Sequence, residues 1–192
     1  MKSNPRSGRP AFTLIELLAV ITIIVILAGL VIGSMGFVQD KQARSKAKVQ
    51  IELISKSLEE YKLDNGTYPP TGATSDGKNY SDDLFKALFF DSDNDGTGPP
   101  SDTDQKIYLA DLDPTAGKQG WTTGTASATT TITDPWGLEF RYRTAVSASG
   151  AANAGTYNPD FDLWSVGKDG VTKAGASDLP SAKENRDDIR NF

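Results

Sequence analysis

The chain has 192 residues and a formal net charge of −5, and it contains no Cys and no His. That length suits one domain plus an anchor, and the acidic balance argues against nucleic-acid binding, which needs a basic face. Without Cys there is no thiol chemistry, without His the commonest general base is missing, and no other residues form an active-site motif, so we predict a protein that is not an enzyme.

Residues 1–11 precede a long apolar run and are basic, with three Lys or Arg residues and no acid. A secretory signal peptide is also basic at its start, but its cleavage site follows the apolar stretch. Here the small residue Ala11 stands immediately before Phe12, where the apolar run begins. We therefore expect cleavage between Ala11 and Phe12, which would remove residues 1–11 as a leader peptide.

The apolar run from Phe12 to Ile32 is long enough to cross a bilayer, which takes about 20 apolar residues. Its one carboxylate is Glu16, and an ionised side chain is costly in hydrocarbon unless it finds a cationic partner. Cleavage before Phe12 would free an α-amino group one helical turn away. The two charges can pair within one chain or between staggered chains of a filament, so we predict that Glu16 supports assembly and that residues 12–36 form the transmembrane and filament-core segment.

The region around the predicted cut resembles the class III prepilin signal that type IV pilins share with type II secretion pseudopilins; it reads Ala11-Phe12-Thr13-Leu14-Ile15-Glu16-Leu17. The resemblance implies cleavage by a prepilin peptidase, N-methylation of Phe12, and a role of Glu16 in subunit registration. It also implies a single-pass inner-membrane protein with a cytoplasmic N-terminus, an orientation that the basic residues on both sides of the run do not settle. The family usually has Gly before the cut, where this chain has Ala11.

A second helical pattern follows the apolar run, and an Asn65-Gly66 pair predicts where it ends. We therefore predict one helix from about residue 12 to 64, in which residues 37–66 are amphipathic and pack on a C-terminal sheet. The apolar residues of this part recur at four- and three-residue spacing, which places them on one face: Ala47, Ile51, Ile54, Leu58 and Tyr61.

Three glycines, Gly29, Gly33 and Gly36, lie between the two parts of the predicted helix. Each weakens a helix by about 0.5–1 kcal/mol relative to Ala. Close packing of helices in the membrane and local loosening of the helix in a filament explain them equally well.

The middle of the chain, residues 67–133, is weakly patterned and reads as a variable loop region or an insertion. Residues 82–90 favour a short helix, and the Thr/Ala/Ser/Gly tract at 122–133 is typical of an exposed loop. Between them, an Asp-x-Asp-x-Asp-Gly run has the spacing of an EF-hand calcium loop. Its twelfth residue is Asp rather than Glu and two prolines precede it, so a solvated acidic turn explains the run as well as a Ca²⁺ site does. The candidate ligands are Asp91, Asp93, Asp95 and Asp102.

Strand patterns return in residues 134–192, after an Asp-Pro-Trp-Gly turn. Leu138, Phe140 and Tyr142 alternate with charged residues, a period of two that predicts a half-buried strand with Arg143 on its exposed face. Residues 160–166 read as the returning strand. Together these elements predict an α+β, pilin-like fold, with a long N-terminal helix packed on a small C-terminal antiparallel sheet.

Both ends of the chain also resemble the major (G-type) pseudopilins of type II secretion, in residues 61–69, 134–137, 162–170 and 187–192. The resemblance implies a structural subunit of a pseudopilus, assembled from the inner membrane into the periplasm to drive protein export. The implied partners are further copies of the chain, prepilin peptidase, minor pseudopilins and the inner-membrane assembly platform.

The resemblance further implies a structural Ca²⁺ in the C-terminal loop. Clustered carboxylates repel one another, and a hard cation that takes about 6–8 oxygen ligands relieves this repulsion. A simple turn at residues 169–170 is the alternative. Carried over by position, the ligands are the side chains of Asp169 and Asp188 and the backbone carbonyls of Val166 and Val171, with Asn185 or Asp187 completing the shell.

Two other functions fit parts of the sequence. A surface type IV pilin, for adhesion, motility or DNA uptake, would share the N-terminal signal, but many such pilins close the C-terminal loop with a disulfide, which a chain without Cys cannot form. A membrane-anchored enzyme or binding protein would use the signal only for export, and the lack of His and of a nucleophile motif argues against the enzyme. A Glu16→Ala variant that is processed but not assembled would favour the filament proteins.

Overall fold

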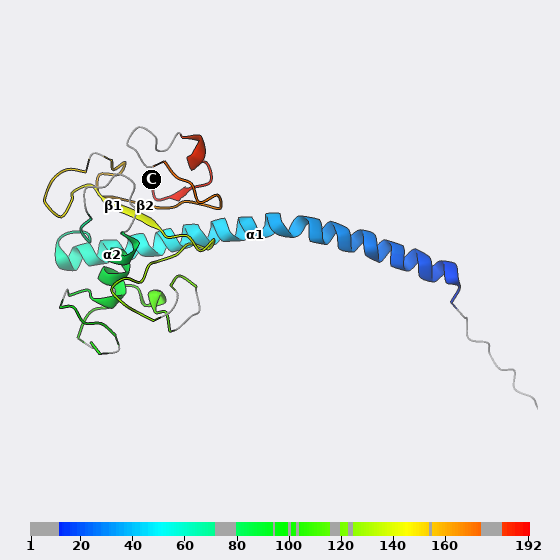
Figure 1. Ribbon diagram of the computed structural model, residues 1–192, viewed down its shortest axis with the longest axis horizontal. Helices are drawn as coiled ribbons and strands as arrows, with labels where there is room; N and C mark the ends of the chain where they lie inside the picture. The colour runs from blue at the N-terminus through cyan, green and yellow to red at the C-terminus, as the bar shows by residue number, and fades with distance from the viewer. Residues whose placement is uncertain are drawn as a thin grey trace, which may run out of the picture. The chain divides into compact units, whose positions relative to one another are not determined.

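The structure is a computed structural model that describes residues 12–71, 80–93, 95–99, 101–102, 104–115, 120–122, 125–153, 155–173 and 182–192. It divides into two compact units, one ending at Lys41 and the other spanning Gln42–Phe192. The helix α1 (Leu14–Asn65) contributes residues to both units (Figure 1). The predicted single helix is therefore confirmed, with its ends displaced by only a residue or two.

In the first unit, α1 is apolar on all sides. Its large side chains are exposed, from 50% at Ile21 to 83% at Leu14. By length and composition alone, this helix is able to cross a membrane. It continues unbroken through Gly29, Gly33 and Gly36, and among the described residues no atom outside the helix backbone lies within 4 Å of where a Cβ would stand at these glycines.

In the second unit, one face of α1 forms the centre of the hydrophobic core. The helix ends as predicted, because Gly66 adopts a φ of 77° and its amide donates to the Lys62 carbonyl at 2.8 Å. The predicted apolar stripe is confirmed, since all five of its members are at most 6% exposed: Ala47, Ile51, Ile54, Leu58 and Tyr61.

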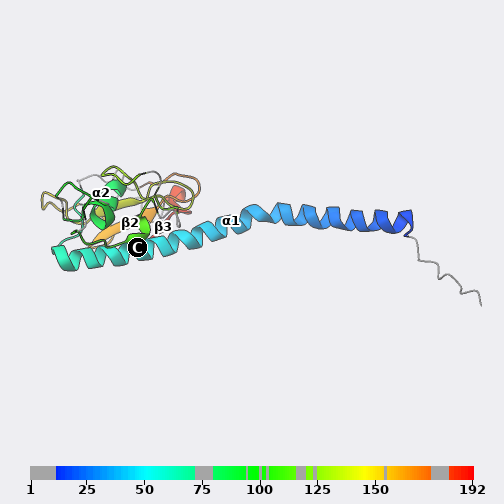
Figure 2. The ribbon, with the colours of Figure 1, turned by 90° about the horizontal axis from the view of Figure 1, so that it is seen from below.

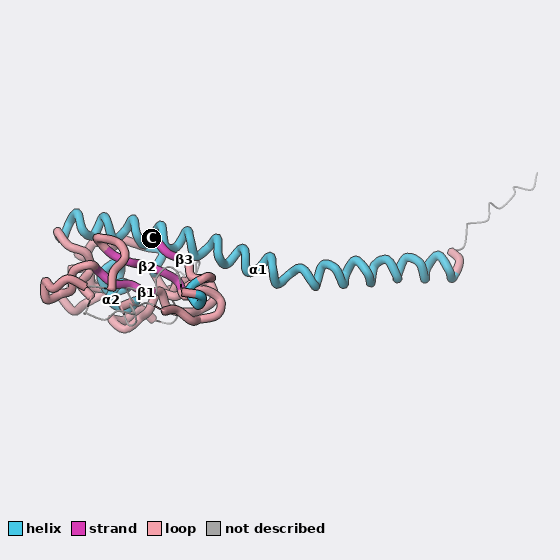
Figure 3. The backbone as a smooth tube through the Cα atoms, turned by 90° about the horizontal axis from the view of Figure 1, so that it is seen from above, coloured by secondary structure: helices cyan, strands magenta, loops and turns pink. Residues whose placement is uncertain are grey.

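The sheet consists of β1 (Arg141–Thr144), β2 (Phe161–Ser165) and β3 (Ile189–Arg190), antiparallel and in that order. Figures 2 and 3 show it alongside the second half of α1, where Tyr142, Phe161 and Leu163 join the core. The predicted hairpin of β1 and β2 is confirmed. The strand β3 was not predicted, because two residues are too few to show an alternation.

The prediction that Arg143 lies on an exposed face is wrong, since its side chain is fully buried. Its Nη2 and Nε atoms lie 2.8 and 2.9 Å from one carboxylate oxygen of Asp162. The guanidinium also lies over the Trp164 ring, 5.1 Å from its centroid. A buried partner of opposite charge thus overrides the alternation of polar and apolar residues.

The weakly patterned middle of the chain supplies much of the core. Leu84 and Phe85 of α2 (Ser81–Phe85) are fully buried, as are Leu88 of the π-helical turn Lys86–Phe90 and Leu112 of the 3-10 turn Ala110–Leu112. The short helix predicted at 82–90 is therefore confirmed, although its second half is wound more loosely than an α-helix.

The prediction of an exposed loop at 122–133 is wrong at both ends, where Thr122 and Ile132 are buried. The Thr122 hydroxyl donates to the Leu112 carbonyl at 2.9 Å. The Ser81 hydroxyl accepts from the Ile132 amide at 2.7 Å and donates to the Ile132 carbonyl at 2.8 Å. Because these hydroxyls satisfy the backbone, a polar tract can enter the interior.

Candidate assembly and metal-binding sites

The N-terminal site begins at Phe12, since Ala11 lies outside the described residues. Thr13 precedes the first helical residue, and its amide and hydroxyl donate to one oxygen of the Glu16 carboxylate at 2.9 and 2.7 Å. The Glu16 amide lies 3.3 Å from the Thr13 hydroxyl. This reciprocal arrangement is a capping box, which satisfies helix amides that have no partner within the helix.

This role of Thr13 was not predicted, although the pattern Thr13-x-x-Glu16 in the sequence is typical of a capping box. The structure thus gives Glu16 a second role besides the predicted one. Its carboxylate stays exposed in the first turn of α1, where the positive end of the helix dipole also favours an anion. In a cleaved chain, the positive amine of Phe12 would be separated from Glu16 by residues 13–15.

The C-terminal loop brings two of the predicted metal ligands together. The Asp169 amide donates to the Asp187 carboxylate at 3.1 Å, and the Val171 amide donates to the Asp169 carboxylate at 2.9 Å. Gly167 makes this approach possible, since a Cβ there would lie 2.6 Å from the Asp187 carbonyl oxygen. The loop after β2 and the segment before β3 therefore meet at these acids.

Asp188 is half-buried beside them, and its Oδ2 accepts from the Thr172 hydroxyl at 2.9 Å. Its Oδ1 is buried and has no hydrogen-bond partner. Burial raises the pKa of Asp188 to about 6, and the neighbouring charges of Asp187 and Asp169 add to the rise. The carboxylates thus lie close enough to repel one another.

The other predicted ligands occupy different positions. Asn185 is fully buried, and its side-chain amide bonds both the amide and the carbonyl of Lys173 at 2.7 Å. Val166 is buried with its side chain in a small cluster with Trp164, whereas Val171 is 48% exposed. Among the described residues, the carboxylates of this loop do not converge on one point as a metal cluster would require.

In the acidic run in the middle of the chain, three carboxylates do lie close together. One carboxylate oxygen from each of Asp91, Asp93 and Asp95 lies within 4.8 Å of the others. Asp102, the fourth residue predicted there, is not part of this group among the described residues. Both acidic loops are present, and among the described residues only the one in the middle brings three carboxylate oxygens together.

Comparison with known proteins gives two family matches in the N-terminal part of the chain and one relative that matches nearly all of it. Residues 6–32 match the prokaryotic N-terminal methylation motif, and residues 35–77 match the family of protein G of the type II secretion system. The type II secretion system core protein G of Pseudomonas aeruginosa is 32% identical over 178 residues, which cover 93% of each chain. The chain belongs to the type II secretion protein G family.

Other members of the protein G family match mainly over a shorter stretch. The core protein G of Klebsiella michiganensis is 41% identical over 66 residues, 34% of this chain and 46% of that protein. The protein of Escherichia coli K12 is 42% identical over 60 residues, 31% of this chain and 41% of that protein. A crystal structure of the major pseudopilin from enterohaemorrhagic Escherichia coli aligns with a TM-score of 0.41 at 21% identity, covering 82% of this chain and 93% of that one.

Proposed function

We propose that this protein G family member is a non-catalytic structural subunit of a type II secretion pseudopilus. The observation that carries the proposal is the similarity to a core protein G over 93% of both chains, together with the methylation motif at residues 6–32. The exposed apolar surface of α1 supports it, because such a surface needs lipid or further copies of the same helix around it. Membership of the type II secretion protein G family favours a secretion pseudopilus over a surface type IV pilus.

In this proposal, residues 1–11 are removed by a prepilin peptidase between Ala11 and Phe12, and the new Phe12 amine is methylated. Before assembly, the protein spans the bacterial inner membrane once, with its N-terminus in the cytoplasm and the unit from Gln42 onward in the periplasm. Minor pseudopilins and the membrane assembly platform are the further partners. The helix is then withdrawn from lipid into the filament, where the amine pairs with Glu16 of a neighbouring subunit.

We also propose that the C-terminal loop binds a structural Ca²⁺. The buried Asp188 Oδ1 without a partner and the contact between Asp169 and Asp187 fit such an ion, because carboxylate oxygens are the ligands that Ca²⁺ prefers. The ion would relieve the mutual repulsion of these acids. It would also tie the end of β2 to the segment that leads into β3.

The experiment that tests the assembly role compares Glu16→Ala with Glu16→Gln. Glutamine still accepts the capping hydrogen bonds from Thr13, but it carries no charge to pair with an amine. We expect both variants to be cleaved normally and both to be absent from filaments, measured by the mobility of the processed chain and by crosslinked ladders in cells.

A Thr13→Ala variant is the control for the cap, because it removes the hydroxyl bond and keeps the Glu16 charge. We expect it to assemble. If Glu16→Gln produces normal ladders while Glu16→Ala does not, helix capping explains the need for this residue and charge pairing is wrong. If both variants produce normal ladders, the proposed role of Glu16 in assembly is wrong.

A further inference from the structure

The acidic run begins a closed loop that follows the π-helical turn. The side chain of Gln105 closes its base with two hydrogen bonds to the backbone. The Ser92 amide donates to Gln105 Oε1 at 3.0 Å, and Gln105 Nε2 donates to the Phe90 carbonyl at 2.9 Å. Lys106 then joins the loop to α1, with its Nζ 2.9 Å from Glu60 and 2.6 Å from Asp64. The loop is therefore held at its base by contacts that do not involve the acidic side chains of the run.

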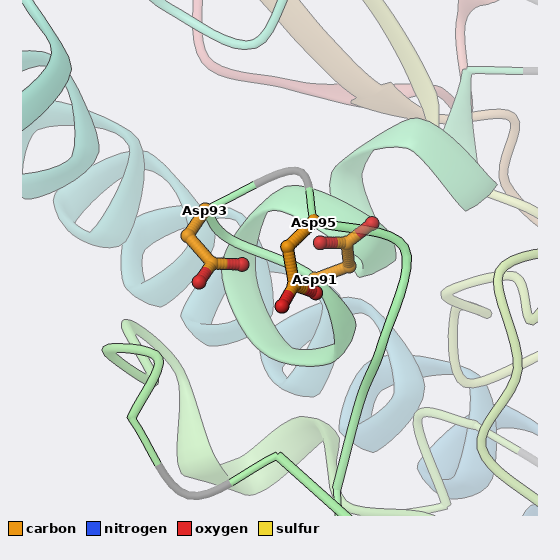
Figure 4. A group of neighbouring side chains, drawn as sticks. All are labelled: Asp91, Asp93 and Asp95. Atoms are coloured by element: carbon orange, nitrogen blue, oxygen red, sulfur yellow. The ribbon is translucent and has the colours of Figure 1, made fainter.

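Three carboxylates crowd together at the start of this loop. Figure 4 shows Asp93 and Asp91 each turning an oxygen toward Asp95, and the three nearest oxygens lie within 4.8 Å of one another. Asp93 and Asp95 are exposed, whereas Asp91 is only 1% exposed. Three negative charges at this separation repel one another unless a cation lies between them.

A second observation points to a ligand at the same place. Asp91 Oδ2 has partners, since Lys86 Nζ lies 3.1 Å away and the Gly96 amide donates to it at 3.2 Å. Asp91 Oδ1, by contrast, is buried without any hydrogen-bond partner, and so is Oδ2 of Asp102. Buried acceptors without partners are costly and rare in native proteins. A metal ion held by the three aspartates would satisfy the Asp91 oxygen.

We propose that Asp91, Asp93 and Asp95 bind a divalent cation of the Ca²⁺ type, each through one carboxylate oxygen. The residues stand at positions 1, 3 and 5 of the EF-hand spacing, and Gly96 has the φ of 87° that a sharp turn requires at position 6. The backbone carbonyl of Thr97 and the carboxylate of Asp102 stand at positions 7 and 12. All of these donors are oxygen atoms, and their irregular arrangement suits Ca²⁺ better than the near-ideal octahedral geometry that Mg²⁺ requires.

This site is separate from the ion proposed in the C-terminal loop, and neither depends on the other. Its role would be to order the acidic loop between the π-helical turn and Lys106. Lys86 pairs with Oδ2 of Asp91, so it can stay in place while an ion binds Oδ1, and its positive charge would then weaken binding of the ion.

The test measures the number of Ca²⁺ ions bound to the full chain in detergent micelles, by equilibrium dialysis after removal of metal with a chelator. The double variant Asp93→Asn/Asp95→Asn changes only exposed side chains, so the fold should survive, and circular dichroism checks this. We expect it to bind one ion fewer than the wild type. The control Asp111→Asn, which removes one exposed carboxylate elsewhere, should bind the wild-type number.

The variant Asp169→Asn/Asp188→Asn separates the two proposed sites. If Asp169→Asn/Asp188→Asn binds one ion fewer than the wild type and Asp93→Asn/Asp95→Asn binds the wild-type number, the proposed site in the acidic run is wrong and the C-terminal site is supported. If only Asp93→Asn/Asp95→Asn binds one ion fewer, the site in the acidic run is supported and the C-terminal site is wrong. A wild-type chain that binds no Ca²⁺ overturns both.

A gain-of-affinity variant provides an independent measurement. Lys86→Gln removes a positive charge beside Asp91 that repels a bound cation, so we expect the acidic run to bind Ca²⁺ several-fold more tightly in a calorimetric titration of the full chain carrying Asp169→Asn/Asp188→Asn. Unchanged or weaker binding would place the ion away from Asp91 and overturn the proposed ligand set.

Discussion

At the scale of single residues, the pair Arg143 and Asp162 stands out because both side chains are fully buried. Asp162 also accepts the backbone amides of Tyr157 and Asn158, each at 2.8 Å. The pair thus fixes the loop between β1 and β2 as well as neutralising its own charges. Breaking a buried pair is costly because the remaining charge stays in the interior without a partner.

We therefore predict that Asp162→Asn lowers the free energy of unfolding by about 3–5 kcal/mol, the usual cost of leaving one buried charge unpaired. Urea unfolding of the full chain in detergent, followed by tryptophan fluorescence, measures this. The control is Asp160→Asn two residues away, since that carboxylate is 53% exposed and pairs with an exposed Lys62. Equal losses in the two variants would contradict the special cost of the buried pair.

At the scale of elements, α1 changes character along its length. Up to Lys41 its apolar side chains are exposed, and beyond it one face is buried against the sheet, α2 and the chain after it. The same helix thus has two environments, lipid or neighbouring helices for the first part and its own core for the second. The stability of the second unit accordingly depends on the buried stripe and not on the helix as a whole.

We predict that Ile54→Ala, at a position with no exposed surface, destabilises the second unit by about 2–5 kcal/mol through the cavity it leaves. Val49→Ala is the matched control, because Val49 lies on the same helix and is 52% exposed. The urea midpoints of the two full-length variants measure the difference. Ala is the better helix former at both positions, so a similar loss in the two variants would contradict a special cost of the cavity at Ile54.

At the scale of the whole molecule, the C-terminal segment closes the sheet. The Asn191 amide donates to the Leu163 carbonyl at 3.1 Å, and the Leu163 amide donates to the Asn191 side chain at 2.9 Å. The loop before it brings Asp169, Asp187 and Asp188 together, so repulsion between these acids acts directly on the attachment of β3 to β2. A cation in that loop would stabilise the unit that contains the entire core.

We predict that Ca²⁺ raises the melting temperature of the full chain and that Asp169→Ala removes part of this rise. A ligand at one hundred times its dissociation constant adds about 2.7 kcal/mol, enough for a shift of several degrees. The measurement is a thermal melt in Ca²⁺ and in chelator, with Asp111→Ala as the control. If Asp169→Ala is destabilised equally in both conditions, the residue serves a structural turn and binds no ion.

The sequence by itself determined the features that repeat locally. The apolar run, the stripe from Ala47 to Tyr61, the helix end at Gly66 and the hairpin all follow from a fixed period or a turn residue, and the structure has each of them. The candidate acids were equally visible, because the spacing of ligands in a metal loop is a property of the chain. A helix or a turn is formed by residues close in sequence, so its pattern can be recognised in the sequence alone.

Only the tertiary structure decided what depends on residues far apart. It buried Arg143 by placing Asp162 opposite it in the register of β1 and β2, and it drew Ile132 into the core through Ser81. It added β3, whose two residues carry no period of their own but pair with β2. It also left Asp91 buried with an unsatisfied oxygen, because burial depends on which distant segments fold over a side chain.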